Sequence, residues 1–188
     1  MENTLRTLRR FGRLSTANIE AFAAQLERVE LPRNTELIRE GEVSPYFYFL
    51  EKGATKTNYI DEYGDKKAVW FAFEGELLFS FSAYFAVEGH QESIELYEDS
   101  VLYRIPLRKL RYLYDTDLEW ANWGRLISER FLGKVLTEMD RNRFVKAKDR
   151  YRWLIESRPD IHKRVPLKDI ASYLGISKES LSRIRKEQ

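Results

Sequence analysis

Between residues 35 and 105 the apolar residues form short runs that are separated by polar turns. Examples are YFYFLEK before Gly53, AVWFAF before Glu74, and the later stretch SIELYEDSVLYRIPL. Aromatic-rich runs that recur at roughly ten-residue intervals between Gly-containing turns are typical of an antiparallel barrel or sandwich. The intervening FSFSAYFAVEG fits neither period, and we interpret it as a short helix or loop that interrupts the strands.

Helical spacing precedes this region. Residues 1–28 have a helical pattern, with Ser15 as the expected N-cap of a helix that carries Ile19, Phe22 and Leu26 on one face. The sequence LPRN at 31–34 breaks the pattern.

A second helical region runs from Leu107 to about Lys146. Its apolar positions recur every three or four residues, and the stripe is wider than a strict coiled-coil seam. We predict one long helix over 107–146 that forms a dimer seam, although burial of the whole stripe inside one chain is the alternative. The predicted interface residues are Trp120, Trp123, Ile127, Phe131 and Val135.

The closing stretch, LKDIASYLGISKESLSRIRKEQ at 167–188, predicts two helices joined by a tight turn. Apolar residues from Leu167 to Leu174 fit one face of the first helix. Gly175 supplies a left-handed turn position, and Ser177 is placed to cap the second helix. Two helices around a short Gly-containing turn form a helix-turn-helix, or a charged αα-hairpin without a DNA-binding role.

The second of these helices carries side chains that suit DNA. In a helix-turn-helix its N-terminal residues meet base edges, while flanking basic groups meet phosphates. Lys178 and Arg183 can donate to guanine, and Glu179 can accept from cytosine. The predicted DNA-binding residues are Ser177, Lys178, Glu179, Ser180, Arg183, Arg185 and Lys186.

Charge is distributed unevenly along the chain. The net charge is only +2, yet residues 141–188 carry 14 Lys and Arg against 6 Asp and Glu, whereas residues 1–140 carry 18 against 24. A basic end on an acidic body favours contact of that end with a polyanion, or a solvated basic helix face.

Composition excludes several classes. The 188 residues contain no cysteine, which rules out disulfides and thiol chemistry and fits a reducing cytoplasm. No apolar run has the length of a membrane span, and no signal peptide is apparent. Two histidines without cysteine predict no metal site, and no nucleophile or phosphate-loop motif is present, so we predict neither an enzyme nor a cofactor.

The stretch KDIASYLGISKESLSRIRK resembles the recognition unit of the CRP/FNR transcription regulators. Their base-reading pattern of Ser, a basic residue, Glu and a later Arg matches Ser177, Lys178, Glu179 and Arg183. RVPLKDIA resembles the second wing strand running into the first helix of that unit. The order of parts also agrees with the family.

The resemblance implies an α+β fold in three parts. The first is an antiparallel β-roll (a jelly roll) like that of cyclic-nucleotide-binding domains, with flanking helices, over 1–106. A long dimerisation helix over 107–146 and a winged helix-turn-helix over 147–188 follow.

In nucleotide-binding relatives a Gly-Glu-Leu opens the ligand cassette, and an Arg with a hydroxyl residue later grips the cyclic phosphate. Gly75, Glu76 and Leu77 match the first part, but no Lys or Arg occurs from Leu77 to Tyr103. The places of the Arg and its partner fall on His90 and Gln91, or on Glu92 and Ser93, in an acidic segment that would repel phosphate. We therefore expect no cyclic AMP there, and either an empty cassette or a less charged or aromatic ligand. The candidate pocket residues are Gly75, Glu76, Leu77, His90, Gln91 and Ser93.

Two functions follow. The first is a homodimeric bacterial transcription regulator that binds double-stranded DNA and pivots its DNA-binding part near residues 144–149, with RNA polymerase as a further partner through a surface that the sequence does not identify. The second is a ligand- or protein-binding β-roll module whose helix-turn-helix does not read sequence.

Overall fold

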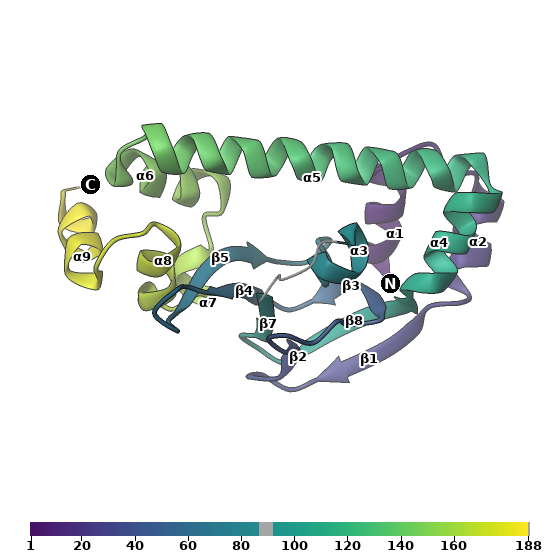
Figure 1. The fold of residues 1–188 in the computed structure, drawn as a ribbon, viewed down its shortest axis with the longest axis horizontal. Coiled ribbons are helices and arrows are strands. Elements are labelled where there is room, and N and C mark those ends of the chain that lie inside the picture. Colours follow the sequence, from purple (N-terminus) through teal and green to yellow (C-terminus); the bar gives the residue numbers. More distant parts are fainter. Residues whose placement is uncertain (87–91, 188) are drawn as a thin grey trace.

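The computed structural model describes residues 1–86 and 92–187. Two four-stranded antiparallel sheets form a β-roll, a helix runs the length of the molecule along one side of it, and a group of short helices lies at the far end (Figure 1). The chain begins beside the β-roll and ends in the group of short helices. The predicted β-roll with flanking helices is therefore confirmed.

Two helices precede the sheets. They are α1 (Glu2–Arg10) and α2 (Thr16–Ala23). The hydroxyl of Ser15 accepts a hydrogen bond from the Asn18 amide, so Ser15 is the N-cap of α2 as predicted. The helical pattern ends earlier than expected, because Glu27–Leu31 form strand β1 and pair with β8.

The sheets bring distant segments together. The strand order is β1-β8-β3-β6 in one sheet and β2-β7-β4-β5 in the other. Helix α3 (Phe81–Phe85) lies between β6 and the segment before β7, where the sequence predicted a short helix or loop. The strands after β1 are β2 (Glu36–Ile38), β3 (Tyr46–Lys52), β4 (Thr55–Ile60), β5 (Lys66–Ala72), β6 (Leu77–Phe79), β7 (Glu92–Leu96) and β8 (Ser100–Pro106).

The region predicted as one helix is two. Helix α4 (Leu107–Thr116) is followed by α5 (Leu118–Phe144), and Asp117 separates them. Asp117 has an extended backbone, and its carboxylate accepts hydrogen bonds from the amides of Glu119 and Trp120. An Asp with these contacts starts a new helix, so the chain turns there instead of continuing straight.

The apolar stripe of α5 is mostly core of its own chain, which corrects the predicted dimer interface. Trp120, Trp123 and Ile127 are at most 3% exposed and pack with residues of β3, β6 and α2. The indole of Trp123 donates to the carbonyl of Leu8 at 3.1 Å. These three side chains are therefore unavailable to a second copy. Phe131 and Val135 are half-buried.

The C-terminal part contains α6 (Ala147–Ser157), α7 (Ile161–Arg164), α8 (Leu167–Tyr173) and α9 (Lys178–Lys186). The predicted wing is wrong, since no strand occurs in residues 107–187. Ile161 and Val165 are both buried at helical spacing, and the Val165 amide donates to the Ile161 carbonyl at 2.8 Å. One helical turn therefore stands where a wing strand was expected.

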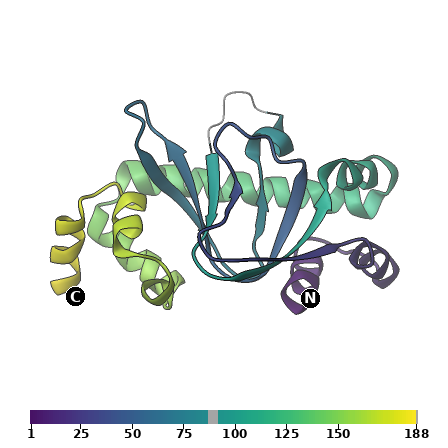
Figure 2. The ribbon, with the colours of Figure 1, turned by 90° about the horizontal axis from the view of Figure 1, so that it is seen from below.

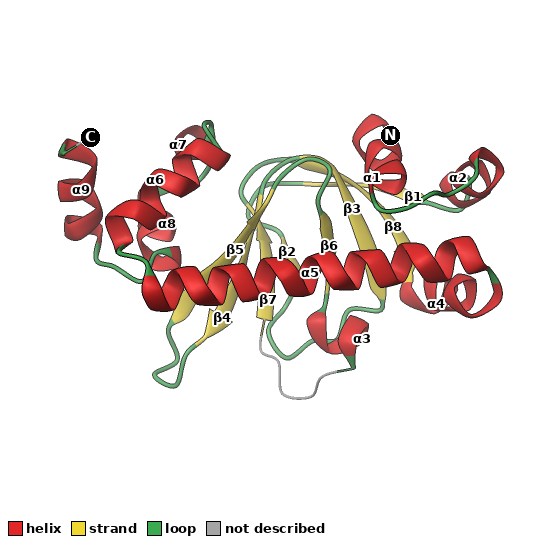
Figure 3. Ribbon diagram, turned by 90° about the horizontal axis from the view of Figure 1, so that it is seen from above, coloured by secondary structure: helices red, strands yellow, loops and turns green. Residues whose placement is uncertain are grey.

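The C-terminal helices are packed against the β-roll. Helix α8 lies along β5 (Figures 2 and 3). One apolar cluster combines Phe71 and Phe73 of the β-roll with Ile170 and Leu174. The Ala68 amide donates to the Ser172 hydroxyl at 3.0 Å. The helices are thus held in one orientation by apolar burial together with specific polar contacts.

Candidate functional site

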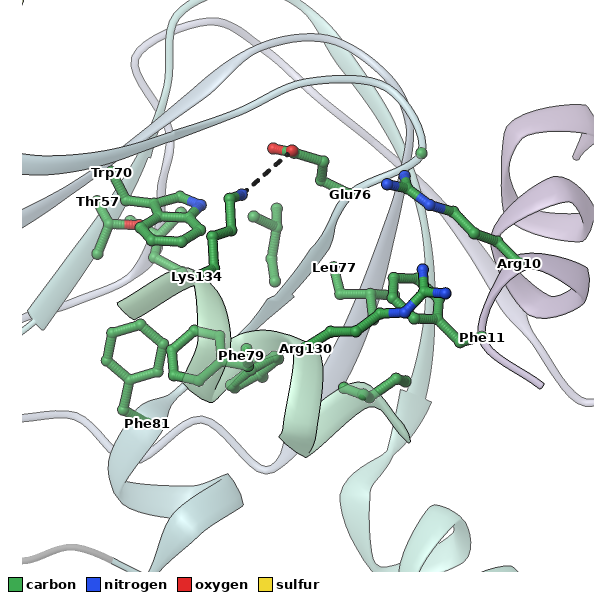
Figure 4. A pocket seen from close by; sticks show the side chains of 15 residues that line it. Arg10, Phe11, Thr57, Trp70, Glu76, Leu77, Phe79, Phe81, Arg130 and Lys134 are labelled. Carbon is green, nitrogen blue, oxygen red and sulfur yellow. Dashed lines mark ion pairs between the residues drawn. The ribbon is translucent and has the colours of Figure 1, made fainter. Parts of the chain in front are cut away.

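A cavity of about 280 Å³ lies between the β-roll and α5 (Figure 4). Its walls come from the end of α1, strands β4, β5 and β7, residues 75–79, the start of α3, and α5. The side chains of Trp70, Phe79, Phe81 and Phe131 give it an aromatic lining. The ring centroids of Phe81 and Phe131 are 5.3 Å apart.

The predicted Gly-Glu-Leu residues line this cavity. Gly75 has a φ of 79°, a left-handed conformation that glycine adopts without strain. Its carbonyl accepts a hydrogen bond from the Thr7 hydroxyl at 2.8 Å, which holds the turn against α1. Glu76 and Leu77 follow at the cavity wall.

The Glu76 carboxylate is already paired within the protein. Arg158, after α6, donates to Oε1, and the Lys134 amine of α5 lies 3.6 Å from the same oxygen. The Phe73 amide donates to Oε2 at 3.2 Å. The Glu76 carboxylate therefore joins the β-roll, α5 and the C-terminal helices.

A carboxylate also occupies the start of α3. Oε1 of the buried Glu92 accepts from the Phe81 amide at 2.7 Å and from the Ser80 hydroxyl at 2.9 Å. Free amides at the first turn of a helix are the groups that bind an anion. Here the Glu92 carboxylate accepts from the Phe81 amide, and the Ser80 hydroxyl accepts from the Ala83 amide.

Of the remaining predicted pocket residues, Ser93 lies in the described part of the chain. Ser93 is 2% exposed within β7 and does not line the cavity. His90 and Gln91 lie outside the described residues.

Three cations at the cavity were missed by sequence reasoning. They are Arg10 at the end of α1, and Arg130 and Lys134 on α5. Each is far in sequence from the expected cassette, and its presence depends on how the helices pack. A possible signal was the placement of Arg130 and Lys134 four residues apart, beside Phe131 on the apolar stripe.

A group of ion pairs holds the C-terminal helices to the β-roll. The Arg164 guanidinium donates to both oxygens of Glu74, at 2.8 and 2.7 Å, and also to Glu98. Burial alone would raise the pKa of Glu74, but hydrogen bonds from Arg164 and from the Gly53 amide outweigh it and lower that pKa to about 2. The Glu74 carboxylate is therefore charged in the folded protein at neutral pH.

The second surface of interest is α9. Leu181 is 1% exposed and anchors the helix in the apolar cluster of the C-terminal helices. The Ser177 hydroxyl accepts from the Ser180 amide at 3.1 Å, and Gly175 has a φ of 64°. The predicted N-cap and left-handed turn residue thus have the expected geometry.

The charged side chains of α9 do not all face the same way. Glu179, Arg183 and Lys186 are exposed and spaced four and three residues apart, which places them on the face opposite Leu181. Arg185 lies toward His162: burial and then the charge of Arg185 lower the pKa of that imidazole. The outer face of α9 is therefore formed by Glu179, Arg183 and Lys186.

Two other kinds of site are not indicated. Residues 1–86 and 92–187 contain no group of three or more His, Asp or Glu side chains able to hold a metal ion. In this part of the chain, no helix combines the length and the apolar run that crossing a bilayer requires.

Comparison with protein families gives one match. Residues 28–117 match the family described as cyclic nucleotide-binding domain. The match covers the β-roll and α4 and ends where α5 begins. No curated protein matches the chain.

Solved structures match over most of the chain. The structure of FixK2 from Bradyrhizobium japonicum has a TM-score of 0.71 at 18% identity, covering 86% of this chain and 83% of FixK2. A protein from Eubacterium rectale, described as a transcriptional regulator of the CRP/FNR family, gives 0.70 at 17%, with coverages of 93% and 83%.

A third match is CLP from Xanthomonas campestris, described as a c-di-GMP-responsive global regulator. Its TM-score is 0.66 at 20% identity, and the match covers 92% of this chain and 91% of CLP. At these identities the matches show a shared fold. They confirm the CRP/FNR resemblance at that level.

Proposed function

We propose that residues 28–117, which match the cyclic nucleotide-binding domain family, form the sensor half of a homodimeric, DNA-binding transcription regulator of the CRP/FNR type. The observation that carries the proposal is the outer face of α9. This face presents one carboxylate and two cations on a helix that is capped by Ser177 and anchored by Leu181.

That face has the chemistry of base reading in a major groove. The Arg183 guanidinium is a bidentate donor suited to guanine, and the Glu179 carboxylate can accept from the cytosine amino group. Lys178 in the first turn and Lys186 in the last are placed for phosphates. The Glu179 carboxylate is an ionised acceptor, because hydrogen bonds from its own backbone amide and then from the Ser177 hydroxyl lower its pKa.

The proposed dimer uses a different face of α5 from the one predicted. Leu132, Leu136 and Met139 are 57%, 51% and 61% exposed, and their spacing of four and three places them together on the side away from the β-roll. Dimeric helix-turn-helix proteins present their recognition helices about one turn of DNA, roughly 34 Å, apart, and we propose that pairing of this face with its copy gives this arrangement. We place the seam on these three residues.

We further propose that cyclic AMP is not the effector. The Glu92 carboxylate holds the α3 amide that a cyclic phosphate would need, and Glu76 is engaged by Arg158. The CRP/FNR resemblance also favours a bacterial cytoplasmic protein without enzymatic activity, with RNA polymerase as a partner.

Selection from a pool of random duplexes tests the function. Enrichment of a palindrome whose half-sites are one helical turn apart is the expected result. Binding that falls steeply with salt but enriches no sequence would instead favour the alternative, a β-roll module whose α9 no longer reads bases.

A further inference from the structure

The geometry points to a small organic anion with an apolar body, such as an aromatic or medium-chain monocarboxylate, as the ligand of the cavity between the β-roll and α5. This inference rests on the proposed function, because it names the effector class of the same sensor domain.

The walls of the cavity select an apolar body. Besides the aromatic side chains, Leu77, Leu78, Ile94 and Ile127 line it. Its volume of about 280 Å³ is close to the lower end of the range for small-molecule sites. Rings and methylene groups gain by leaving water for such a surface, whereas an unpaired polar group would lose its hydration there.

The mouth of the cavity selects a negative charge. Figure 4 shows Arg10 and Lys134 on opposite sides of Glu76, with Arg130 beside Phe11. Arg10 and Arg130 lie over the ring of Phe11, with guanidinium carbons 5.5 and 5.2 Å from its centroid. In the described part of the chain no carboxylate is within ion-pair distance of either guanidinium.

Lys134 is held in a position suited to an anion inside the cavity. Its amine lies 3.9 Å from the centroid of the Trp70 ring and 3.6 Å from Glu76. Burial lowers the pKa of Lys134, and the Glu76 charge only partly opposes this effect. A ligand carboxylate beside this amine would favour its charged form.

The balance of charges supports one anionic group. Among the described residues that line the cavity, Arg10, Arg130 and Lys134 are cations, whereas the one acidic side chain, Glu76, also accepts from Arg158. A nucleotide is disfavoured because Glu92 takes the α3 amide and no Lys or Arg occurs from Leu77 to Tyr103. A single carboxylate at the mouth with an apolar body inside satisfies both parts of the site.

Calorimetric titration of the purified protein tests the inference with matched probes. Phenylpropionate and octanoate are each compared with the corresponding alcohol, phenylpropanol or octanol. The acids should bind saturably, and each alcohol should bind at least about tenfold more weakly, because one charge-assisted hydrogen bond accounts for such a factor.

Substitutions at Lys134 and Arg130 test whether these cations recognise the ligand carboxylate. Lys134→Gln and Arg130→Gln should each weaken binding of the acid by about tenfold while leaving the alcohol unchanged. Two matched controls, Lys109→Gln on α4 and Arg125→Gln on α5, remove exposed cations that do not line this cavity. They should bind both probes as the wild type does.

Equal binding of acid and alcohol, no binding of either acid, or full acid binding by both cavity variants would overturn the inference. The duplex selection is run on the same preparation without ligand. Palindrome enrichment together with failed acid binding would reject the ligand class alone. Acid binding without enrichment would reject the regulator alone.

Discussion

Glu76 of the β-roll accepts a hydrogen bond from Arg158 of the C-terminal helices, although the two residues are 82 positions apart in the chain. The same carboxylate lines the cavity and lies 3.6 Å from Lys134. A change at the cavity mouth therefore acts directly on a contact that fixes the orientation of α8 and α9. This contact gives the proposed sensor a short physical route to the proposed DNA-binding helix.

The interdomain ion pairs should stabilise the docked orientation. Replacing Arg158 and Arg164 together with Gln should favour local opening by about 1 kcal/mol, or roughly fivefold, because these charge-assisted bonds are only partly buried. Hydrogen exchange should accelerate in β5 and α8 and stay unchanged within β8. Arg152→Gln, which removes an exposed cation of α6, is the control. Equal exchange rates in the double variant and the wild type would contradict the prediction.

Low pH should weaken the ion pair between Glu74 and Arg164, because it protonates the Glu74 carboxylate. Its folded pKa of about 2 lies below its ordinary value of 4.5, so its stabilising effect is complete above 4.5 and is lost as the pH falls toward 2. The difference in free energy of unfolding between the wild type and Glu74→Gln should therefore be largest near neutral pH and shrink within that window. A constant difference would exclude the pair as the cause. The exposed Glu62→Gln is the matched control.

The dimer seam can be separated from the core. Leu136→Asp should give a folded monomer, because the side chain faces solvent within one chain, whereas Thr137→Asp, one position along α5, should leave the dimer intact. Trp123→Asp should instead unfold the protein, since removing a fully buried Trp costs about 3–5 kcal/mol. Sedimentation with circular dichroism distinguishes the outcomes, and an intact Leu136→Asp dimer would place the interface elsewhere.

Sequence reading by α9 can be assigned to one side chain. Arg183→Ala should weaken binding to the selected palindrome by about 1–3 kcal/mol, as expected for one bidentate base contact. Binding to random duplex should change far less. Lys163→Ala, which removes an exposed cation of α7, is a control for net charge, and an equal loss on both duplexes would make Arg183 a phosphate contact.

Cyclic AMP should leave the melting temperature unchanged, because Glu92 already uses the Phe81 amide and the Ser80 hydroxyl. Thermal denaturation over a range of cyclic AMP concentrations measures this. A saturable rise in melting temperature would mean that the Glu92 side chain yields its place to the phosphate.

Local sequence patterns predicted much of the fold. The strand runs, the Ser15 and Ser177 caps and the Gly175 turn follow from residues close in sequence, and the structure has each of them. Trp120, Trp123 and Ile127 belong to the core and not to a dimer seam, because helical periodicity identifies an apolar face but not what covers it. Trp123 contacts α1, more than a hundred positions away, and no local pattern contains that information.

The candidate site was predictable only in part for the same reason. Gly75 and Glu76 stand out as a motif, whereas Arg10, Arg130 and Lys134 meet at the cavity only through tertiary packing. The partner of Glu76 was also hidden, because Arg158 is in a part of the chain that sequence reasoning assigned to DNA binding alone.

Helix α5 ends at Phe144 and α6 begins at Ala147, so Val145 and Lys146 are the whole connection between them. Two residues span at most roughly 7 Å, and the C-terminal helices therefore cannot drift away once their contacts break. Their effective concentration at β5 stays very high. Release of the C-terminal helices from β5 is then a rotation about this two-residue connection. A small change in free energy is enough to reverse it.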